Sequence, residues 1–317
     1  MKTAVPIAST ILAEPHPALA TAGRKTSAYV ELTKPRIALM VLITVAIGYI
    51  AGARTVVYPA TSFGRTQPAT LLLTLLGTGL VAAGASVWNQ FIERSRDALM
   101  RRTARRPLPL GTVSPREAAV FGVVLGVVGV AILAVGVNLA SALVALATFF
   151  LYVAVYTPLK PVTTLNTAVG AIPGALPPVI GWAAATGGLD WGGWSLFLIV
   201  FLWQFPHFLA IAWIHREDYA RGGHKMLPSV DPTGALTARQ AVLYALALVP
   251  AGLLPSVMGM AGSFYFAGAL VFGLVYLVQA LRFWRDVSET SARRLLRSSF
   301  LYLPAVLALL LMNPMPA

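Results

Sequence analysis

Long apolar runs separated by short polar stretches dominate this chain of 317 residues. A helix needs about 20 apolar residues to cross the roughly 30 Å hydrocarbon core of a bilayer. The pattern therefore predicts an all-α, polytopic membrane protein, because a lipid-embedded helix satisfies its own backbone hydrogen bonds. Nine spans are expected, at residues 36–53, 70–92, 116–136, 138–157, 165–185, 193–213, 239–258, 262–281 and 297–313.

Two local signals refine these spans. Ser114 and Glu117 have the spacing of a capping box, and Pro115 stands at the first helical position, so the third span should begin there. Prolines at 173, 177 and 178 interrupt the fifth span. Proline removes a backbone donor, and the fifth helix is therefore expected to be kinked or partly unwound.

Composition supports the membrane class and removes several functions. Hydrophobic residues make up 57% of the chain and charged residues 11%, against about 25% charged in a soluble domain. The net charge of +13 would suggest nucleic acid for a soluble protein, but basic residues accumulate in the cytoplasmic loops of membrane proteins, so no nucleic-acid partner is expected. The absence of cysteine excludes disulfides, thiolate metal sites and cysteine nucleophiles.

The distribution of charge predicts the orientation. Of the 24 Lys and Arg residues, 22 fall in the N-terminal segment or around the loops after the second, fourth, sixth and eighth spans, and only Arg54 and Arg65 fall on the other side. A cytoplasmic N-terminus and an external C-terminus follow. We expect residues 1–33 to form a flexible cytoplasmic tail, rather than a cleaved signal peptide, and residues 34–317 to form one transmembrane domain.

Candidate chemistry begins where the second span ends. Asn89, Glu93 and Asp97 recur at intervals of four residues, so a helix places their oxygens on one face. Hard oxygen ligands suit Mg²⁺, which retains sites for phosphate oxygens. Four arginines follow within a few turns, Arg101, Arg102, Arg105 and Arg106, and guanidinium groups match phosphate geometry. The segment predicts a magnesium–diphosphate site; the alternative is that the arginines only follow the charge rule and pair with the acids.

The loop after the sixth span repeats the combination of acids and bases. Glu217 and Asp218 are candidates for a second Mg²⁺, and Lys225 follows the flexible pair Gly222 and Gly223. The second and sixth spans would then face each other across a central cavity that opens to the cytoplasm. Glu217 has an alternative role as the ion-pair partner of its neighbour Arg216.

Two further groups of residues remain open to more than one interpretation. Lys160 and Tyr156 either bind the diphosphate or anchor the fourth span at the membrane interface. His207 lies in an apolar run beside Trp203, where it either ligates haem iron, acts as an acid or base, or hydrogen-bonds within the bundle.

These segments resemble the motifs of the UbiA superfamily of intramembrane prenyltransferases. The similar stretches are Asn89 to Leu108, Tyr156 to Lys160, Trp203 to Phe208 and Asp218 to Pro228. The resemblance implies nine helices, with Asn89, Glu93 and Asp97 holding Mg²⁺ and Asp218 supporting a second ion. It also implies that Arg102, Arg106, Lys160 and Tyr156 bind the diphosphate.

Within the superfamily, the segments are most similar to members that act on haem. This implies Mg²⁺-dependent transfer of a farnesyl group from farnesyl diphosphate to a vinyl group of haem B, with His207 and Trp203 as haem-binding residues. It further implies a location in the cell inner membrane among membrane lipids, a cytoplasmic active site, and haem A synthase or another oxidase-assembly factor as partner.

Two departures and two alternatives accompany the resemblance. Many superfamily members have an acid directly after the asparagine and an Asp as the middle acid, where this chain has Gln90 and Glu93. A sibling enzyme that prenylates an aromatic quinone or chlorophyll precursor is one alternative. A transporter for an anionic solute is the other, although its polar pathway should reach both faces and the outward loops here are nearly uncharged.

Overall fold

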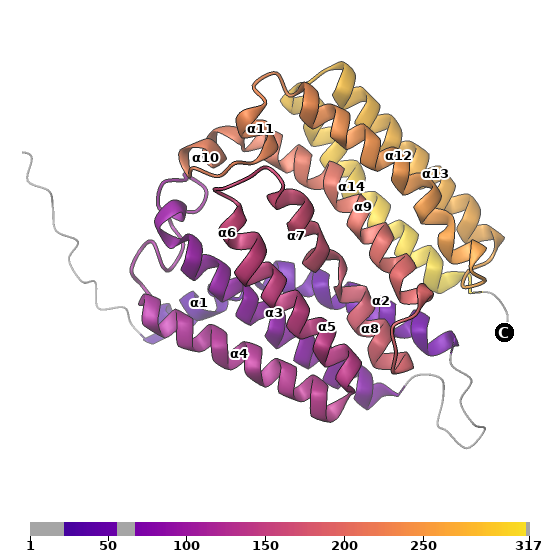
Figure 1. Ribbon diagram of the computed structural model, residues 1–317, viewed down its shortest axis with the longest axis horizontal. Helices are drawn as coiled ribbons and strands as arrows, with labels where there is room; N and C mark the ends of the chain where they lie inside the picture. The colour runs from indigo at the N-terminus through magenta and orange to yellow at the C-terminus, as the bar shows by residue number, and fades with distance from the viewer. Residues whose placement is uncertain (1–21, 56–66, 315–317) are drawn as a thin grey trace, which may run out of the picture.

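The computed structural model describes residues 22–55 and 67–314 (Figure 1). Within those ranges the chain is helical. The helices are α1 (Ala22–Leu32), α2 (Pro35–Thr55), α3 (Pro68–Asp97), α4 (Pro115–Gly136), α5 (Leu139–Phe150), the π-helix η1 (Leu151–Tyr156), α6 (Thr157–Leu159), α7 (Asn166–Ala175), α8 (Pro177–Thr186), α9 (Trp191–Ile214), α10 (Arg216–Arg221), α11 (Leu227–Val230), α12 (Ala235–Val257), α13 (Ser263–Arg285) and α14 (Glu289–Met312).

The predicted spans are confirmed. Nine helical segments of the described ranges are long and apolar enough to cross a membrane, one for each expected run. The helices extend beyond the apolar runs at their polar ends: α3 continues to Asp97 and α14 begins at Glu289. These extensions matter because the end of α3 carries the predicted metal ligands beyond the apolar part of the helix.

The local signals also appear in the structure as expected. Ser114 and Glu117 form both hydrogen bonds of the capping box at the start of α4. The fifth span is divided into α7, which ends at Ala175, and α8, which begins at Pro177. The division follows from the prolines, which cannot donate the backbone hydrogen bonds of a continuous helix.

The first helix differs from the flexible tail expected for residues 1–33. Residues 22–32 form α1, and Ala28 and Leu32 are buried against Val87 and Leu108 in a small hydrophobic cluster. The helix was missed because its apolar positions are few and lie outside any spanning run. Residues 1–21 of the expected tail lie outside the described residues.

Two groups of helices make up the bundle. Figure 1 shows α2, α3, α4, α5, α7 and α8 in one group and α9, α12, α13 and α14 in the other, and α9 packs against members of both. Close backbone approaches at glycine hold the first group together. A Cβ at Gly181 of α8 would lie 1.9 Å from the carbonyl oxygen of Val45 in α2. Small residues allow such contacts between membrane helices.

The polar connections gather at one end of this bundle. In Figure 1 the turn after α3 lies at the same end as α6, α10 and α11. The predicted functional loops, which follow the second, fourth and sixth spans, are therefore neighbours in space.

Candidate active site

A cavity of about 660 Å³ opens beside the polar end of α3. It combines acids, bases, tyrosines and apolar side chains from the end of α1, the start of α2, from α3 and η1, and from the segments after α3, α6 and α9. Its walls are Glu31, Lys34, Pro35, Arg36, Ile37, Asn89, Gln90, Glu93, Asp97, Met100, Arg102, Arg106, Tyr152, Lys160, Tyr219 and His224.

Three side chains of α3, which we call the oxygen row, line this cavity: Asn89, Glu93 and Asp97. The helical repeat aligns them on one face, as their spacing predicts. All three are buried, with exposed fractions of 1%, 5% and 0%. Buried acids at the end of a membrane helix are costly unless they are paired or used.

Each member of the oxygen row has a basic partner. Lys34 Nζ donates to Asn89 Oδ1 at 2.7 Å. Lys160 Nζ lies 2.7 Å from Glu93 Oε1, and Arg106 Nη1 lies 2.7 Å from Asp97 Oδ2. The row is therefore matched, residue by residue, with three cations from three different segments.

The donor set fits a magnesium ion that shares its coordination with a phosphate. Asp97 Oδ1 is buried and has no hydrogen-bond partner in the structure, so one carboxylate oxygen remains available as a ligand. Within the described ranges no three His, Cys, Asp or Glu side chains gather as a metal site, and the row offers two carboxylates and one amide. Mg²⁺ accepts such a sparse set because it retains waters and phosphate oxygens.

Lys34 and Lys160 differ in electrostatic environment. Burial, together with nearby Arg106 and Lys160, lowers the pKa of Lys34 to about 7. Burial would also lower the pKa of Lys160, but Tyr156 and the Glu93 carboxylate outweigh burial and raise that pKa above its usual range. Lys160 thus retains its charge beside a carboxylate, while Lys34 faces a neutral amide.

The loop between α3 and α4, residues 98–114, completes the basic side of the cavity, and we call it the arginine loop. Arg102 and Arg106 both line it, as predicted, and the guanidinium of Arg102 lies 5.9 Å from the ring centroid of Tyr219. Arg101 and Arg105 are exposed and do not line the cavity. The structure thus separates the two pairs of arginines that the sequence places side by side.

Backbone contacts hold the three loops together. Arg96 donates to the carbonyl oxygens of Gly222 and Gly223, at 3.1 and 3.3 Å. The backbone N–H of Lys225 donates to the carbonyl of Lys160 at 2.7 Å. Gly223 has φ +66°, a conformation that glycine adopts without strain, and this turn brings the loop against α3.

Asp218 lies beneath the arginine loop rather than in the cavity wall. Its carboxylate accepts from the backbone N–H groups of Arg101 and Arg102, at 3.3 and 3.4 Å, and pairs with Arg221. Burial opposes ionisation, but the hydrogen bonds from Arg221 and these two N–H groups hold the pKa of Asp218 below its usual range. In this arrangement Asp218 positions the loop that carries Arg102.

Two other predicted residues of this region are exposed. Glu217, expected as a ligand of a second ion, and Lys225, expected to bind the diphosphate, both lie on the surface and outside the cavity lining. Their assigned roles remain predictions.

Trp203 and His207 lie elsewhere, on α9 where it packs against α14. His207 Nδ1 is 2.7 Å from Ser299 Oγ, and Trp203 Nε1 donates to the carbonyl of Ser299 at 2.9 Å. The rings of Trp203 and His207 stack at 4.8 Å. Of the three alternatives for His207, hydrogen bonding within the bundle is the one visible here, and neither residue lines the cavity.

Tyr156 ends the π-helix η1, a distortion often found at functional sites. Its ring lies against Gly170 of α7, where a Cβ would come within 2.5 Å of the ring. Lys160 Nζ lies 4.6 Å from the ring centroid of Tyr156. Tyr156 therefore packs against Lys160 without lining the cavity, and Tyr152, one turn earlier, is the tyrosine that lines it.

The wall residues that sequence reasoning did not find include Lys34, Tyr152 and His224. Lys34 has a usable signal, because a lysine directly precedes Pro35 at the start of the first span. His224 follows the glycine pair in a loop without a recognisable pattern, and Tyr152 has no signal in a run of apolar residues. Their approach to the cavity depends on how the loops fold back.

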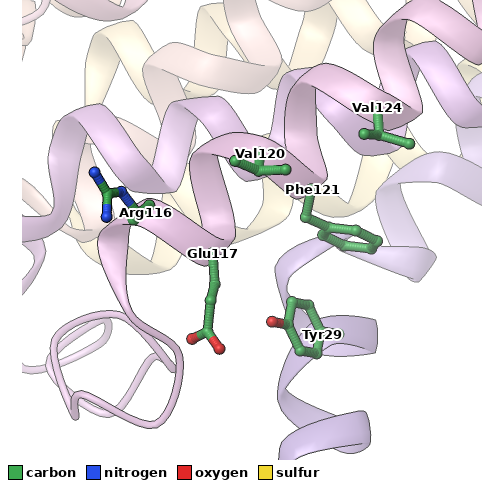
Figure 2. Close-up of a pocket in the computed structure, with 6 residues that line it drawn as sticks. All are labelled: Tyr29, Arg116, Glu117, Val120, Phe121 and Val124. Carbon is green, nitrogen blue, oxygen red and sulfur yellow. The ribbon is translucent and has the colours of Figure 1, made fainter.

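A second cavity, of about 540 Å³, lies between α1 and α4 (Figure 2). Tyr29, Phe121, Val120 and Val124 form an apolar wall there, and Glu117 is paired with Lys25 at 2.6 Å. Glu117 is thus engaged by Lys25 and by the capping box.

Comparison with known proteins identifies the family of this chain. The model of the UbiA prenyltransferase family matches residues 22–303, nearly the whole chain. The chain belongs to the UbiA prenyltransferase family. It is thus an enzyme of prenyl transfer, and the cavity beside the oxygen row is the candidate active site of a UbiA protein.

Curated UbiA relatives cover almost the full length of the chain. It is similar to the protoheme IX farnesyltransferase of Solibacter usitatus, with 47% identity over 90% of this chain and 98% of the relative. The protoheme IX farnesyltransferase of Koribacter versatilis is 41% identical over 95% of this chain and 97% of its own length.

Solved UbiA structures share the fold at low identity. A digeranylgeranylglyceryl phosphate synthase structure has a TM-score of 0.75 and 17% identity, covering 91% of this chain and 98% of its own. A UbiA homologue from Archaeoglobus fulgidus bound to GPP and Mg²⁺ has a TM-score of 0.57 and 17% identity, covering 89% of this chain and 99% of its own.

Proposed function

We propose that this UbiA protein transfers a farnesyl group from farnesyl diphosphate to a vinyl group of haem B, giving haem O. One observation carries the prenyl-transfer chemistry: the buried oxygen row and three matched cations border a single cavity at the end of the membrane bundle. The acceptor is supported by the relatives, which carry the name protoheme IX farnesyltransferase at 41% and 47% identity over 90% or more of this chain.

The polar side chains of the cavity form two groups, one for the metal ion and one for the diphosphate. Asn89, Glu93 and Asp97 would hold Mg²⁺, which neutralises and polarises the leaving diphosphate when bound. Arg102, Arg106 and Lys160 provide charge-assisted hydrogen bonds to the diphosphate oxygens as negative charge accumulates there. Magnesium in the structure of the Archaeoglobus fulgidus homologue supports this assignment by analogy.

The same arrangement leads to an ionisation mechanism without a protein nucleophile. Departure of the diphosphate leaves an allylic cation, the vinyl group attacks it, and water then adds to the product cation. The chain contains no cysteine, and the arginines and Lys160 around the cavity carry positive charge, so they stabilise the leaving group. The apolar side chains of the bundle limit the access of water to the cation.

Asp218, Glu217 and Lys225 complete the proposal in the loop after α9. Asp218 would support a second metal in addition to positioning the arginine loop, with Glu217 beside it. Lys225 would reach the diphosphate from the surface, since its backbone is already joined to that of Lys160.

The haem site is proposed at Trp203 and His207. With Nδ1 of His207 held by Ser299, Nε2 is the ring nitrogen that remains for a ligand. The neighbouring Phe300 is 57% exposed on the bundle surface, which suits an apolar porphyrin arriving through the lipid.

The side of the membrane that the cavity faces is inferred from the distribution of basic residues. Most basic residues lie at the cavity end, which would face the cytoplasm of the cell inner membrane. An apolar product that remains in the membrane suits direct transfer to a haem A synthase or another oxidase-assembly factor.

The deciding experiment incubates the purified protein with haem B, farnesyl diphosphate and Mg²⁺ and measures the haem products by mass spectrometry. The expected result is the mass of haem O, dependent on Mg²⁺. Product with an aromatic quinone precursor, and none with haem, would favour the sibling enzyme. Transport of an anionic solute without any prenylated product would contradict prenyl transfer.

A further inference from the structure

Lys34 occupies an unusual backbone position. It joins α1 to α2, and its φ of +50° is the one positive value among the described non-glycine residues. Side chains other than those of Gly and Asn are disfavoured in this left-handed region. A turn alone would be better served by glycine, so the presence of lysine here points to a use for its side chain.

The side chain of Lys34 reaches the first member of the oxygen row. Its Nζ donates to Asn89 Oδ1 at 2.7 Å, and Asn89 Nδ2 donates to Thr157 Oγ1 at 3.2 Å. This second bond directs the amide oxygen of Asn89 toward Lys34 and the cavity. Lys34 thus contacts the same atom that a metal ion would coordinate.

The other two members are each paired at one of their two carboxylate oxygens. Lys160 contacts Glu93, and Arg106 contacts Asp97, each at 2.7 Å. An ammonium or guanidinium group and a divalent metal ion cannot share one oxygen in a buried site, because their mutual repulsion is weakly screened there. A metal ion that coordinates Asn89 therefore requires Lys34 to move, and one that coordinates the paired oxygens of Glu93 and Asp97 requires Lys160 and Arg106 to move. An incoming diphosphate offers these cations oxygens to move to.

We propose that Lys34, Lys160 and Arg106 compete with the metal ion for the oxygens of the oxygen row. These side chains transfer to the diphosphate when metal and diphosphate bind together. Lys34 is the positioning residue of this exchange at Asn89. Metal and diphosphate consequently bind cooperatively, and each raises the affinity for the other by the same factor. The inference rests on the proposed function only in assuming that the site binds a divalent metal and a diphosphate.

The test measures binding and requires no turnover. Mn²⁺ replaces Mg²⁺ as the probe, its free concentration is followed by electron paramagnetic resonance, and inorganic pyrophosphate replaces the substrate. The Mn²⁺–pyrophosphate complex measured without protein is subtracted. For the wild type we expect weak binding of Mn²⁺ alone and at least ten-fold tighter binding with pyrophosphate.

Lys34→Met should bind Mn²⁺ alone more tightly than the wild type, because the competing cation is gone. Pyrophosphate should raise the Mn²⁺ affinity of this variant less than it raises that of the wild type. Lys34→Gly should show the same binding change together with a higher unfolding temperature, since the strained turn is relieved. Lys34→Arg should retain the cooperativity. Lys25→Met is the matched control, because Lys25 also belongs to α1 but pairs with Glu117 outside the larger cavity.

The outcomes separate this inference from the proposed function. Wild-type Mn²⁺ binding that is equal with and without pyrophosphate would overturn the exchange and leave the proposed function intact. An unchanged or weaker affinity of Lys34→Met for Mn²⁺ alone would reduce Lys34 to a structural turn residue. Failure of the wild type to bind Mn²⁺ or pyrophosphate in any combination would contradict both proposals.

Discussion

Asp97 is the most completely buried member of the oxygen row, and one of its oxygens has no hydrogen-bond partner. Asp97→Asn keeps the size of the side chain and removes the negative charge that a metal requires. We expect turnover to be abolished, a loss of at least about 100-fold, since electrostatic stabilisation of the leaving group is lost. Expression and membrane insertion should be normal by immunoblot of membrane fractions. Wild-type activity of this variant would contradict the metal assignment.

Arg106 and Arg105 form a natural matched pair, because they are adjacent and only Arg106 lines the cavity. A hydrogen bond to a charged group contributes roughly 1.5–3 kcal/mol, and 1.4 kcal/mol corresponds to a factor of ten. Arg106→Gln should therefore raise the KM for farnesyl diphosphate about ten-fold or more. Arg105→Gln should change it by about two-fold at most, as for other surface substitutions. Steady-state kinetics of both variants measure the two KM values. Equal increases would mean that the loop acts through its total charge and that Arg106 makes no specific contact with the diphosphate.

At the scale of elements, α3 gathers the chemistry because it is longer than a membrane span requires. Its last turns carry Glu93 and Asp97 into the polar region, where the loops after α6 and α9 approach them. The position of α3 depends in turn on close packing in the first group of helices. Gly77 and Gly84 of α3, for example, lie against the backbone of Gly129 and Gly122 in α4.

The contact between α2 and α8 offers a stability test. At Gly181 a Cβ would meet backbone atoms, which cannot rotate away, whereas at Gly188 nothing lies within 4 Å. Overpacking of a core costs about 1–3 kcal/mol. Gly181→Ala should therefore lower the unfolding temperature of the detergent-solubilised protein, while Gly188→Ala should leave it unchanged. The same unfolding temperature for both variants would mean that the two helices separate without cost.

For the whole molecule, charge asymmetry predicts the orientation, and the absence of cysteine makes it testable by single-cysteine labelling. Arg105→Cys marks the cavity end and Gly188→Cys the opposite end. In intact cells a membrane-impermeant maleimide should label Gly188→Cys and should label Arg105→Cys only after permeabilisation, because basic loops remain in the cytoplasm. The reverse pattern would place the active site outside.

The spacing of the oxygen row predicted its common face correctly, because an α-helix has one repeat and Asn89, Glu93 and Asp97 follow it. The choice of Arg102 and Arg106 over their neighbours came from the family motif, and the cavity lining agrees with it. The same kind of reasoning did not find Lys34, whose approach to Asn89 depends on the turn between α1 and α2.

The sequence by itself determined the nine spans, the break in the fifth, the cap of α4 and the helical face that carries the acids. These features depend on hydrophobicity and local hydrogen bonding, which are readable within a few turns of chain. Only the tertiary structure decided which cations meet that face, that Asp218 supports the arginine loop, and that Trp203 and His207 lie against α14. Those contacts join segments distant in sequence, and their partners are chosen by packing between helices rather than by any local pattern.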